Sequence, residues 1–150
     1  MLVRDAIEVR RYQATDATFI AALAGEAFSE YSPRAVSHTL DLVLRFGTLV
    51  AVRGTRRLGF IVIGRDGGDV AVLHAIAVSA RERGRGVGHR LMQAFERVAE
   101  ARGAQRLELV TADCNLAALD LFYRRGFRLH ARRHRFYERG QNGCILVRDL

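Results

Sequence analysis

The segment that decides the fold is residues 81–91, RERGRGVGHRL, which places three glycines among four arginines. The apolar run VAVLHAIAV (70–78) precedes it, and apolar residues at helical spacing follow it. When a strand enters a helix through a glycine-rich turn, the first N–H groups of the helix have no backbone partners. Glycine lets an anion approach these groups, while the helix dipole and the arginines add positive charge. We therefore predict that this segment binds a phosphate or a pyrophosphate.

The segment matches neither of two other phosphate-binding patterns. The Walker pattern ends in Gly-Lys-Ser/Thr, and this chain contains no lysine. The dinucleotide pattern spaces its glycines as G-x-G-x-x-G, whereas here they are Gly84, Gly86 and Gly88. Taken alone, a glycine-rich motif is weak, and a flexible connection between strand and helix stays an alternative.

Hydrophobic periodicity predicts alternating strands and helices along the rest of the chain. Strands are expected at 7–12, 48–53, 58–65, 70–78, 106–112, 127–138 and 144–150, and helices at 15–28, 32–46, 87–102 and 115–125. Thr15 or Asp16, Ser32 and Asn115 are suited to cap three of the helices. Tight turns are expected at 54–57 and 139–143. The order βααβββαβαββ predicts an α/β (α+β) fold with a largely antiparallel sheet of about seven strands, four helices and one βαβ crossover.

The composition is that of a globular protein, so we expect a single domain over residues 1–150. Of the 150 residues, 49% are hydrophobic and 27% charged. No apolar run approaches the roughly 20 residues of a membrane span, and the N-terminus lacks the apolar core of a signal peptide. We expect a cytoplasmic protein without a membrane partner. Cys114 and Cys144 have no metal-ligand spacing, so reduced thiols and no metal are expected.

The formal net charge is +8, and it is concentrated in the second half of the chain. Residues 1–75 hold 9 arginines and 8 acidic residues, whereas residues 76–150 hold 15 and 8. Such a surplus suits an anionic small molecule, an anionic surface or nucleic acid. The stretch RRGFRLHARRHRFYERG (124–140) interleaves arginine with aromatic residues, but alternating arginines along a strand more often form a solvated face. We therefore do not favour nucleic acid as the partner.

Two motifs together resemble the GNAT superfamily of acetyl-CoA-dependent N-acetyltransferases. Residues 83–88, RGRGVG, follow the strand end IAV and resemble the signature Arg/Gln-x-x-Gly-x-Gly/Ala. Asn115, Ala118 and the pair Gly126-Phe127 resemble a second signature, Asn-x-x-Ala ending in Gly-Phe. The expected order of elements also matches this family, so the resemblance covers nearly the whole chain.

The resemblance implies acetyl-CoA as cosubstrate and a primary amine of a small molecule or protein as acceptor. The pyrophosphate is expected on the amides of 84–88, and the pantetheine arm along 76–78. The implied cofactor-binding residues are Ile76, Ala77, Val78, Arg83, Gly84, Arg85, Gly86, Val87, Gly88, Asn115 and Phe122. Many relatives form dimers, which makes a homodimer an expectation from the resemblance alone.

The resemblance also implies direct transfer, with a backbone N–H of the strand at 70–78 stabilising the oxyanion. In the family, a tyrosine four residues before the Gly-Phe glycine is usually the acid, and here that residue is Phe122. Tyr123 is the candidate acid instead, although one helical step rotates a side chain by about 100°. Water, or no acid, is the alternative, since a thiol leaves readily; Tyr123 would then be a packing residue.

His74 aligns with a glutamate that some family members use as base, and histidine titrates near neutrality. The alternative is a histidine without chemistry. Glu26, Glu30 and Tyr31 lie where the family often binds the acceptor and could attract a cationic amine, or could simply be solvated. The identity of the acceptor is left open. The second functional hypothesis is a catalytically weak, acetyl-CoA-binding regulatory module, which the loss of the tyrosine at Phe122 supports.

Overall fold

The computed structural model describes residues 6–150, which form seven strands and four α-helices in the predicted order. The strands are β1 (Glu8–Arg11), β2 (Gly47–Arg53), β3 (Arg56–Asp66), β4 (Val70–Val78), β5 (Arg106–Ala112), β6 (Arg128–Arg133) and β7 (Gly143–Asp149). The helices are α1 (Ala17–Phe28), α2 (Ala35–Arg45), α3 (Val87–Ala101) and α4 (Leu116–Arg124), with single 3-10 turns η2 (Ala14–Asp16) and η3 (Ala80–Glu82). The predicted mixed α/β fold is confirmed.

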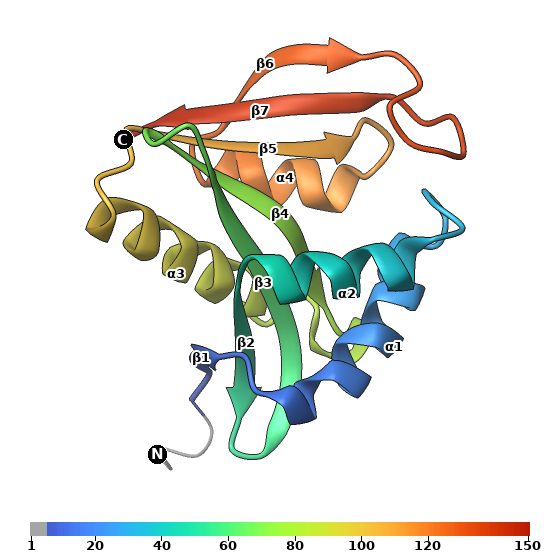
Figure 1. Cartoon of the computed structure of the whole chain (residues 1–150), viewed down its shortest axis with the longest axis vertical. Coiled ribbons are helices and arrows are strands. Elements are labelled where there is room, and N and C mark those ends of the chain that lie inside the picture. Colours follow the sequence, from blue (N-terminus) through green and yellow to red (C-terminus); the bar gives the residue numbers. More distant parts are fainter. Residues whose placement is uncertain (1–5) are drawn as a thin grey trace.

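The strands form one sheet in the order β1-β2-β3-β4-β5-β7-β6. Among the described strands, β4 and β5 are the parallel neighbours, and α3 makes the predicted crossover between them. The two strands pair only from Val70 to Leu73 on β4 and from Arg106 to Leu109 on β5. Beyond this short ladder they diverge, which Figure 1 shows as a V between β4 and β5.

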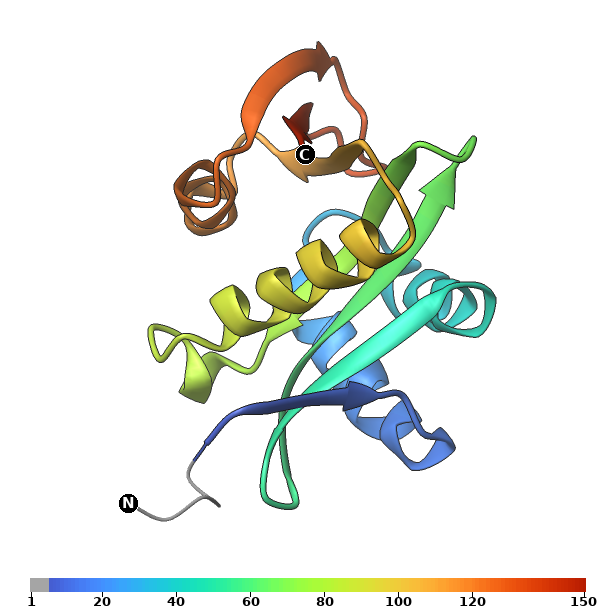
Figure 2. The same cartoon turned by 90° about the vertical axis from the view of Figure 1, so that its left-hand side faces the viewer.

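Helices cover both faces of the sheet, and each face has its own hydrophobic cluster. On one face, α3 buries Leu91, Met92 and Phe95 against β3, β4 and β5. On the other face, Ile20 of α1 and Val43 of α2 pack against β2 and β3. Figure 2 shows α3 and α4 on one side of the sheet and α1 and α2 on the other. Burying each large apolar side chain contributes about 1.5–3 kcal/mol, so these clusters hold the helices on the sheet.

An extra residue interrupts the pairing of β3 with β4. Val62 pairs with Ala75, but the next residue, Ile63, pairs with Leu73, so His74 is the additional residue of a β-bulge. Leu73 packs in the cluster below α3, whereas Ala75 packs in the cluster below α1 and α2. Residues two apart in a regular strand share a face, so the bulge reverses which side chains β4 presents to each layer.

Asp16 directly precedes α1 as predicted, but it does not cap the helix. Its buried carboxylate instead accepts hydrogen bonds from the guanidinium groups of Arg10 and Arg57 and from the N–H of Gln13. These donors hold the pKa of Asp16 well below its usual range. Asp16 thus occupies the predicted cap position, but its oxygens bind two arginines and the N–H of Gln13 instead of an N–H of α1.

The predicted cap of the second helix is also wrong. α2 begins at Ala35, three residues after Ser32. The Ser32 hydroxyl accepts a hydrogen bond from the N–H of Arg34 at 3.1 Å and donates one to the carboxylate of Glu138 at 2.9 Å. A contact more than a hundred residues away in the sequence therefore determines the role of Ser32.

The last hairpin differs most from its prediction. β6 ends at Arg133 rather than continuing to 138, and residues 134–142 form the loop before β7. This β6–β7 loop is tied to the α1–α2 connection, because the N–H of Arg139 donates to the carbonyl of Tyr31 at 3.1 Å and the Gln141 amide donates to the carbonyl of Glu30 at 2.7 Å. Residues 134–138 therefore do not pair with β7 as expected, and the predicted turn at 139–143 contacts a distant segment instead.

Among the residues that the structure describes, no helix is long and apolar enough to cross a membrane.

Gly64 of β3 offers a test of the bulge. A Cβ at this position would overlap Nε2 of His74 and lie 3.0 Å from Cδ1 of Phe46. We expect Gly64→Ala to lower the free energy of unfolding by about 1–3 kcal/mol through overpacking, measured by urea denaturation. The control is Gly47→Ala, because a Cβ there would meet its nearest neighbour at an ordinary 3.5 Å. Equal stability of the two variants would show that His74 does not lie against β3.

Candidate active site

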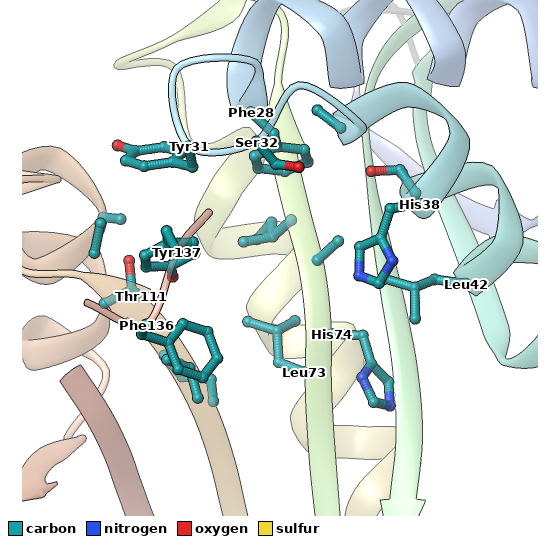
Figure 3. A pocket seen from close by; sticks show the side chains of 18 of the residues that line it. Phe28, Tyr31, Ser32, His38, Leu42, Leu73, His74, Thr111, Phe136 and Tyr137 are labelled. Carbon is teal, nitrogen blue, oxygen red and sulfur yellow. The ribbon is translucent and has the colours of Figure 1, made fainter. Parts of the chain in front are cut away.

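A cavity of about 850 Å³ opens where β4 and β5 diverge. Its walls come from β4, β5, α2 and α4, from the α1–α2 connection and from the β6–β7 loop. Residues around it include Phe28, Tyr31, His38, Leu73, His74, Ile76, Thr111, Asn115, Phe122, Phe136 and Tyr137, several of which Figure 3 labels. This volume and mixed apolar and polar lining are typical of a small-molecule site.

Four of the predicted site residues meet in this cavity: His74, Ile76, Asn115 and Phe122. The other predicted residues on β4 lie elsewhere. Ala77 is buried in the cluster below α1 and α2, while Val78 packs against the cluster below α3. The bulge at His74 determines this division of β4 side chains between the two faces.

The backbone of β4 is open on one side beyond the bulge. Its pairing with β3 continues to Val78, but its pairing with β5 ends at Leu73. The β5-facing N–H and C=O groups of residues 74–78 therefore have no strand partner. An extended ligand can add to such an edge through main-chain hydrogen bonds.

The glycine segment forms a left-handed turn directly before α3. Gly84 and Gly86 have φ of 74° and 87°, values that favour glycine, and Gly86 directly precedes α3. A Cβ at either position would meet no atom within 4 Å, so space lies open above the turn. Gly88 differs, because it lies inside α3 and its Cβ would come within 3.3 Å of Leu121 of α4. In the fold, Gly88 allows α3 and α4 to pack closely.

A second cavity, of about 460 Å³, lies beside the first turns of α3. Arg85 and Gly86 line it, together with His89, Arg90 and Arg53. Guanidinium groups are well suited to phosphate oxygens, so the surroundings of this turn are electrostatically favourable to an anion. The predicted residues Arg83 and Gly84 of the turn, and Val87 and Gly88 at the start of α3, line neither cavity.

A buried carboxylate that sequence reasoning missed anchors this turn. Glu82, only 1% exposed, pairs with Arg53 at 2.9 Å and with Arg56 at 3.3 Å. Hydrogen bonding from Arg53 lowers the pKa of Glu82 and keeps it ionised. One feature of the sequence could have indicated this role, because Glu82 is the sole acidic residue between Asp69 and Glu96. Its partners lie on the β2–β3 hairpin, which no local pattern connects to the turn.

His74 lies on the α2 side of the cavity. Its ring stacks on Phe46 with centroids 4.2 Å apart and an interplanar angle of 21°. Nε2 is buried and has no hydrogen-bond partner among the described residues. Burial, and secondarily the charge of His38, lower the pKa of His74. The imidazole is therefore neutral near pH 7, the form that accepts a proton.

Helix α4 brings Asn115 and Phe122 to the cavity but not Tyr123. The Asn115 side chain caps the helix by accepting a hydrogen bond from the N–H of Ala118 at 3.2 Å, as predicted. Phe122 is 2% exposed, whereas Tyr123 is 48% exposed and does not line the cavity. One step along the helix turns Tyr123 outward, so α4 offers no hydroxyl group here.

Two other tyrosines line the cavity. The rings of Tyr31 and Tyr137 lie 5.2 Å apart, and burial raises the pKa of both hydroxyls, that of Tyr31 to about 12. The family resemblance placed Tyr31 near the acceptor. Tyr137 was not predicted, because residues 127–138 were expected to form a strand. Glu26 and Glu30, by contrast, are exposed and do not line the cavity.

Within residues 6–150, no group of three or more His, Cys, Asp or Glu side chains is arranged to hold a metal ion.

Comparison with family models matches residues 12–127 to the Acetyltransferase (GNAT) family. The chain belongs to the GNAT acetyltransferase family. The match spans both the glycine turn and the Gly126-Phe127 pair, the two motifs that carried the resemblance. A comparison with curated proteins finds no match.

Solved structures share this GNAT fold over almost their whole length. Ard1 from Thermoplasma volcanium is 24% identical, covers 97% of this chain and 98% of its own, and superposes with a TM-score of 0.88. The ribosomal-protein-S18-alanine N-acetyltransferase of Escherichia coli is 20% identical over 96% and 94%, with a TM-score of 0.82. YncA of Salmonella typhimurium, solved with its cofactor acetyl-CoA, is 16% identical over 97% and 94%, with a TM-score of 0.77.

The anchoring role of Glu82 can be tested without any ligand. We expect Glu82→Gln to loosen the turn, because a neutral amide cannot hold two guanidinium groups, and to speed amide hydrogen exchange at residues 83–86 by about fivefold or more. Glu100→Gln is the control, since Glu100 is exposed on α3 and makes no ion pair with the described residues. Equal exchange in both variants would contradict the anchor.

Proposed function

We propose that this GNAT protein transfers the acetyl group of acetyl-CoA directly to a primary amine of a small molecule or protein. The divergence of β4 from β5 carries the proposal. It leaves the unpaired edge of residues 74–78 between a turn suited to a diphosphate and a cavity suited to the acetyl group and the acceptor.

The residues present fit coenzyme A. The left-handed turn at Gly84 and Gly86 offers open space and unpaired helix N–H groups for the diphosphate, with Arg83 and Arg85 nearby. The arginines and His89 around the second cavity suit further phosphate charge. The edge at 76–78 would hold the pantetheine arm by main-chain hydrogen bonds, opposite Asn115 at the start of α4.

Acetyl-CoA supplies the thioester carbonyl that the amine attacks. His74 would accept the proton that the amine must lose, directly or through water. An unpaired N–H of β4 beyond the bulge would donate to the oxyanion as it forms. Most of the rate acceleration would come from holding the two reactants in a shared cavity.

A regulatory module that binds acetyl-CoA without efficient transfer is the second candidate, because Phe122 lacks a hydroxyl and Tyr123 points away from the cavity. Calorimetry with coenzyme A, combined with thiol release and mass spectrometry over a panel of amino acids, polyamines, aminoglycosides and peptides, separates the two. Transfer supports the enzyme, and binding without transfer to any amine supports the module. Absence of binding would overturn both.

Gly86 tests the diphosphate site. We expect Gly86→Ala to raise the dissociation constant of acetyl-CoA by about tenfold or more, because the methyl group enters the open space above the turn and strains its backbone. Gly103→Ala is matched in backbone strain, with φ of 77° and no neighbour within 4 Å, but lies at the other end of α3. It should leave affinity unchanged; a similar loss in both variants would count against the site.

If His74 is the base, kcat should depend on pH in a specific way. Because its pKa is lowered, kcat should fall only as the pH drops below about 6.5, the ordinary value for histidine. His74→Gln should lower kcat by about 10²-fold and remove this acidic limb. His38→Gln should move the limb to higher pH, because it removes a neighbouring positive charge. An unchanged profile in His74→Gln would exclude His74 as the base.

A further inference from the structure

We propose that Tyr137, on the β6–β7 loop, donates a hydrogen bond to the departing sulfur and so supplies the group that α4 lacks. This assignment rests on the proposed acetyl transfer. Tyr137 lies outside both family motifs, ten residues after Phe127.

The helix that borders the cavity presents a phenyl ring where a donor is needed. Phe122 is almost fully buried and lines the cavity, and its ring meets Phe127 edge-on at 6.0 Å. Rotation of α4 to bring Tyr123 inward would expose Phe122, which is 2% exposed. Helix α4 therefore supplies no hydroxyl, and a side-chain donor comes from another element of the cavity wall.

The ring of Tyr137 is held in place within that wall. Tyr31 lies on one side with centroids 5.2 Å apart, and Phe136 meets it edge-on at 4.9 Å. The backbone of the loop is also fixed, since the N–H of Tyr137 donates to the carbonyl of Gln141 at 3.1 Å and Arg139 is bonded to Tyr31. A donor that is positioned before the reaction needs no reorganisation during it.

The hydroxyls of Tyr137 and Tyr31 differ in their neighbours. No hydrogen bond from the described residues occupies the Tyr137 hydroxyl. The Tyr31 hydroxyl faces the Glu30 carboxylate and the Cys114 thiol, which raise its pKa together with burial. Burial likewise raises the pKa of Tyr137, so its hydroxyl stays protonated at any working pH and acts as a donor.

Tyr137 and His74 lie on opposite walls of the cavity, with Leu73 between them (Figure 3). This arrangement separates the two proton-related tasks. As the new C–N bond forms, the nitrogen gives its proton to His74. As the C–S bond breaks, its electron pair stays on sulfur, where the hydrogen bond from Tyr137 stabilises the thiolate until water protonates it. The Tyr137 proton is shared but not transferred.

The test compares Tyr137→Phe with the parent chain, using acetyl-CoA and an acceptor found in the amine panel. We expect kcat to fall by about 10²-fold, the usual effect of removing one transition-state donor, while KM and the dissociation constant for acetyl-CoA stay within about twofold. Tyr123→Phe is the matched control, since it removes a hydroxyl outside the cavity, and it should keep the parental kcat. The Phe ring preserves the packing against Tyr31 and Phe136, and thermal unfolding checks this.

A second measurement separates stabilisation of the leaving group from a structural role. The selenoester analogue of acetyl-CoA releases a selenolate, which is more stable than a thiolate and needs less help. If the hydroxyl acts on the leaving atom, the fall in kcat caused by Tyr137→Phe should shrink to less than about tenfold with the selenoester. The assignment would be overturned if Tyr137→Phe lowered kcat as much with the selenoester as with acetyl-CoA. It would also be overturned if Tyr137→Phe kept the parental kcat with acetyl-CoA. Either result would leave acetyl transfer itself intact. A parent chain that transfers no acetyl group would overturn the proposed function itself.

Discussion

The short parallel ladder between β4 and β5 is the constraint on which the rest of the structure depends. The two strands share only four residue pairs before they separate, and the extra residue at His74 lies where the ladder ends. A bulge bends its strand and increases the local twist. Beyond it, β4 stays paired with β3 to Val78, while β5 stays paired with β7 to Ala112. The cavity, the open backbone edge and the location of the imidazole all follow from this one irregularity.

Arginine takes two roles in this lysine-free chain. Three buried carboxylates each receive two guanidinium groups: Asp16 from Arg10 and Arg57, Glu82 from Arg53 and Arg56, and Glu96 from Arg125 and Arg148. These clusters join elements that are distant in the sequence, and Glu96 links α3, α4 and β7. The planar guanidinium fork suits such shared contacts better than a lysine ammonium group. The arginines around the glycine turn that have no carboxylate partner within residues 6–150, such as Arg85 and Arg90, are suited to an anion.

The cavity separates groups whose environments move their pKa values in opposite directions. Burial lowers the pKa of His74 and raises those of Tyr31 and Tyr137. A desolvated base and a desolvated donor on opposite walls are suited to a reaction in which one atom loses a proton while another gains negative charge. Burial is the first cause of each of these shifts, so the chemistry proposed here depends on how the cavity walls enclose these side chains.

The sequence by itself determined the order of elements, both hydrophobic faces and the glycine turn, because strand and helix periods and left-handed glycine positions are local properties. It also identified Asn115 as a cap, since that hydrogen bond spans three residues. Only the tertiary structure decided the remainder. Partners far away in the chain drew Asp16 and Ser32 from their expected caps. The β6–β7 loop folded toward the α1–α2 connection and brought Tyr137 to the cavity, while the rotation of α4 buried Phe122 and turned Tyr123 to solvent. Contacts between segments 41 to 111 residues apart hold Asp16, Ser32 and the β6–β7 loop in place, and no local pattern encodes these contacts.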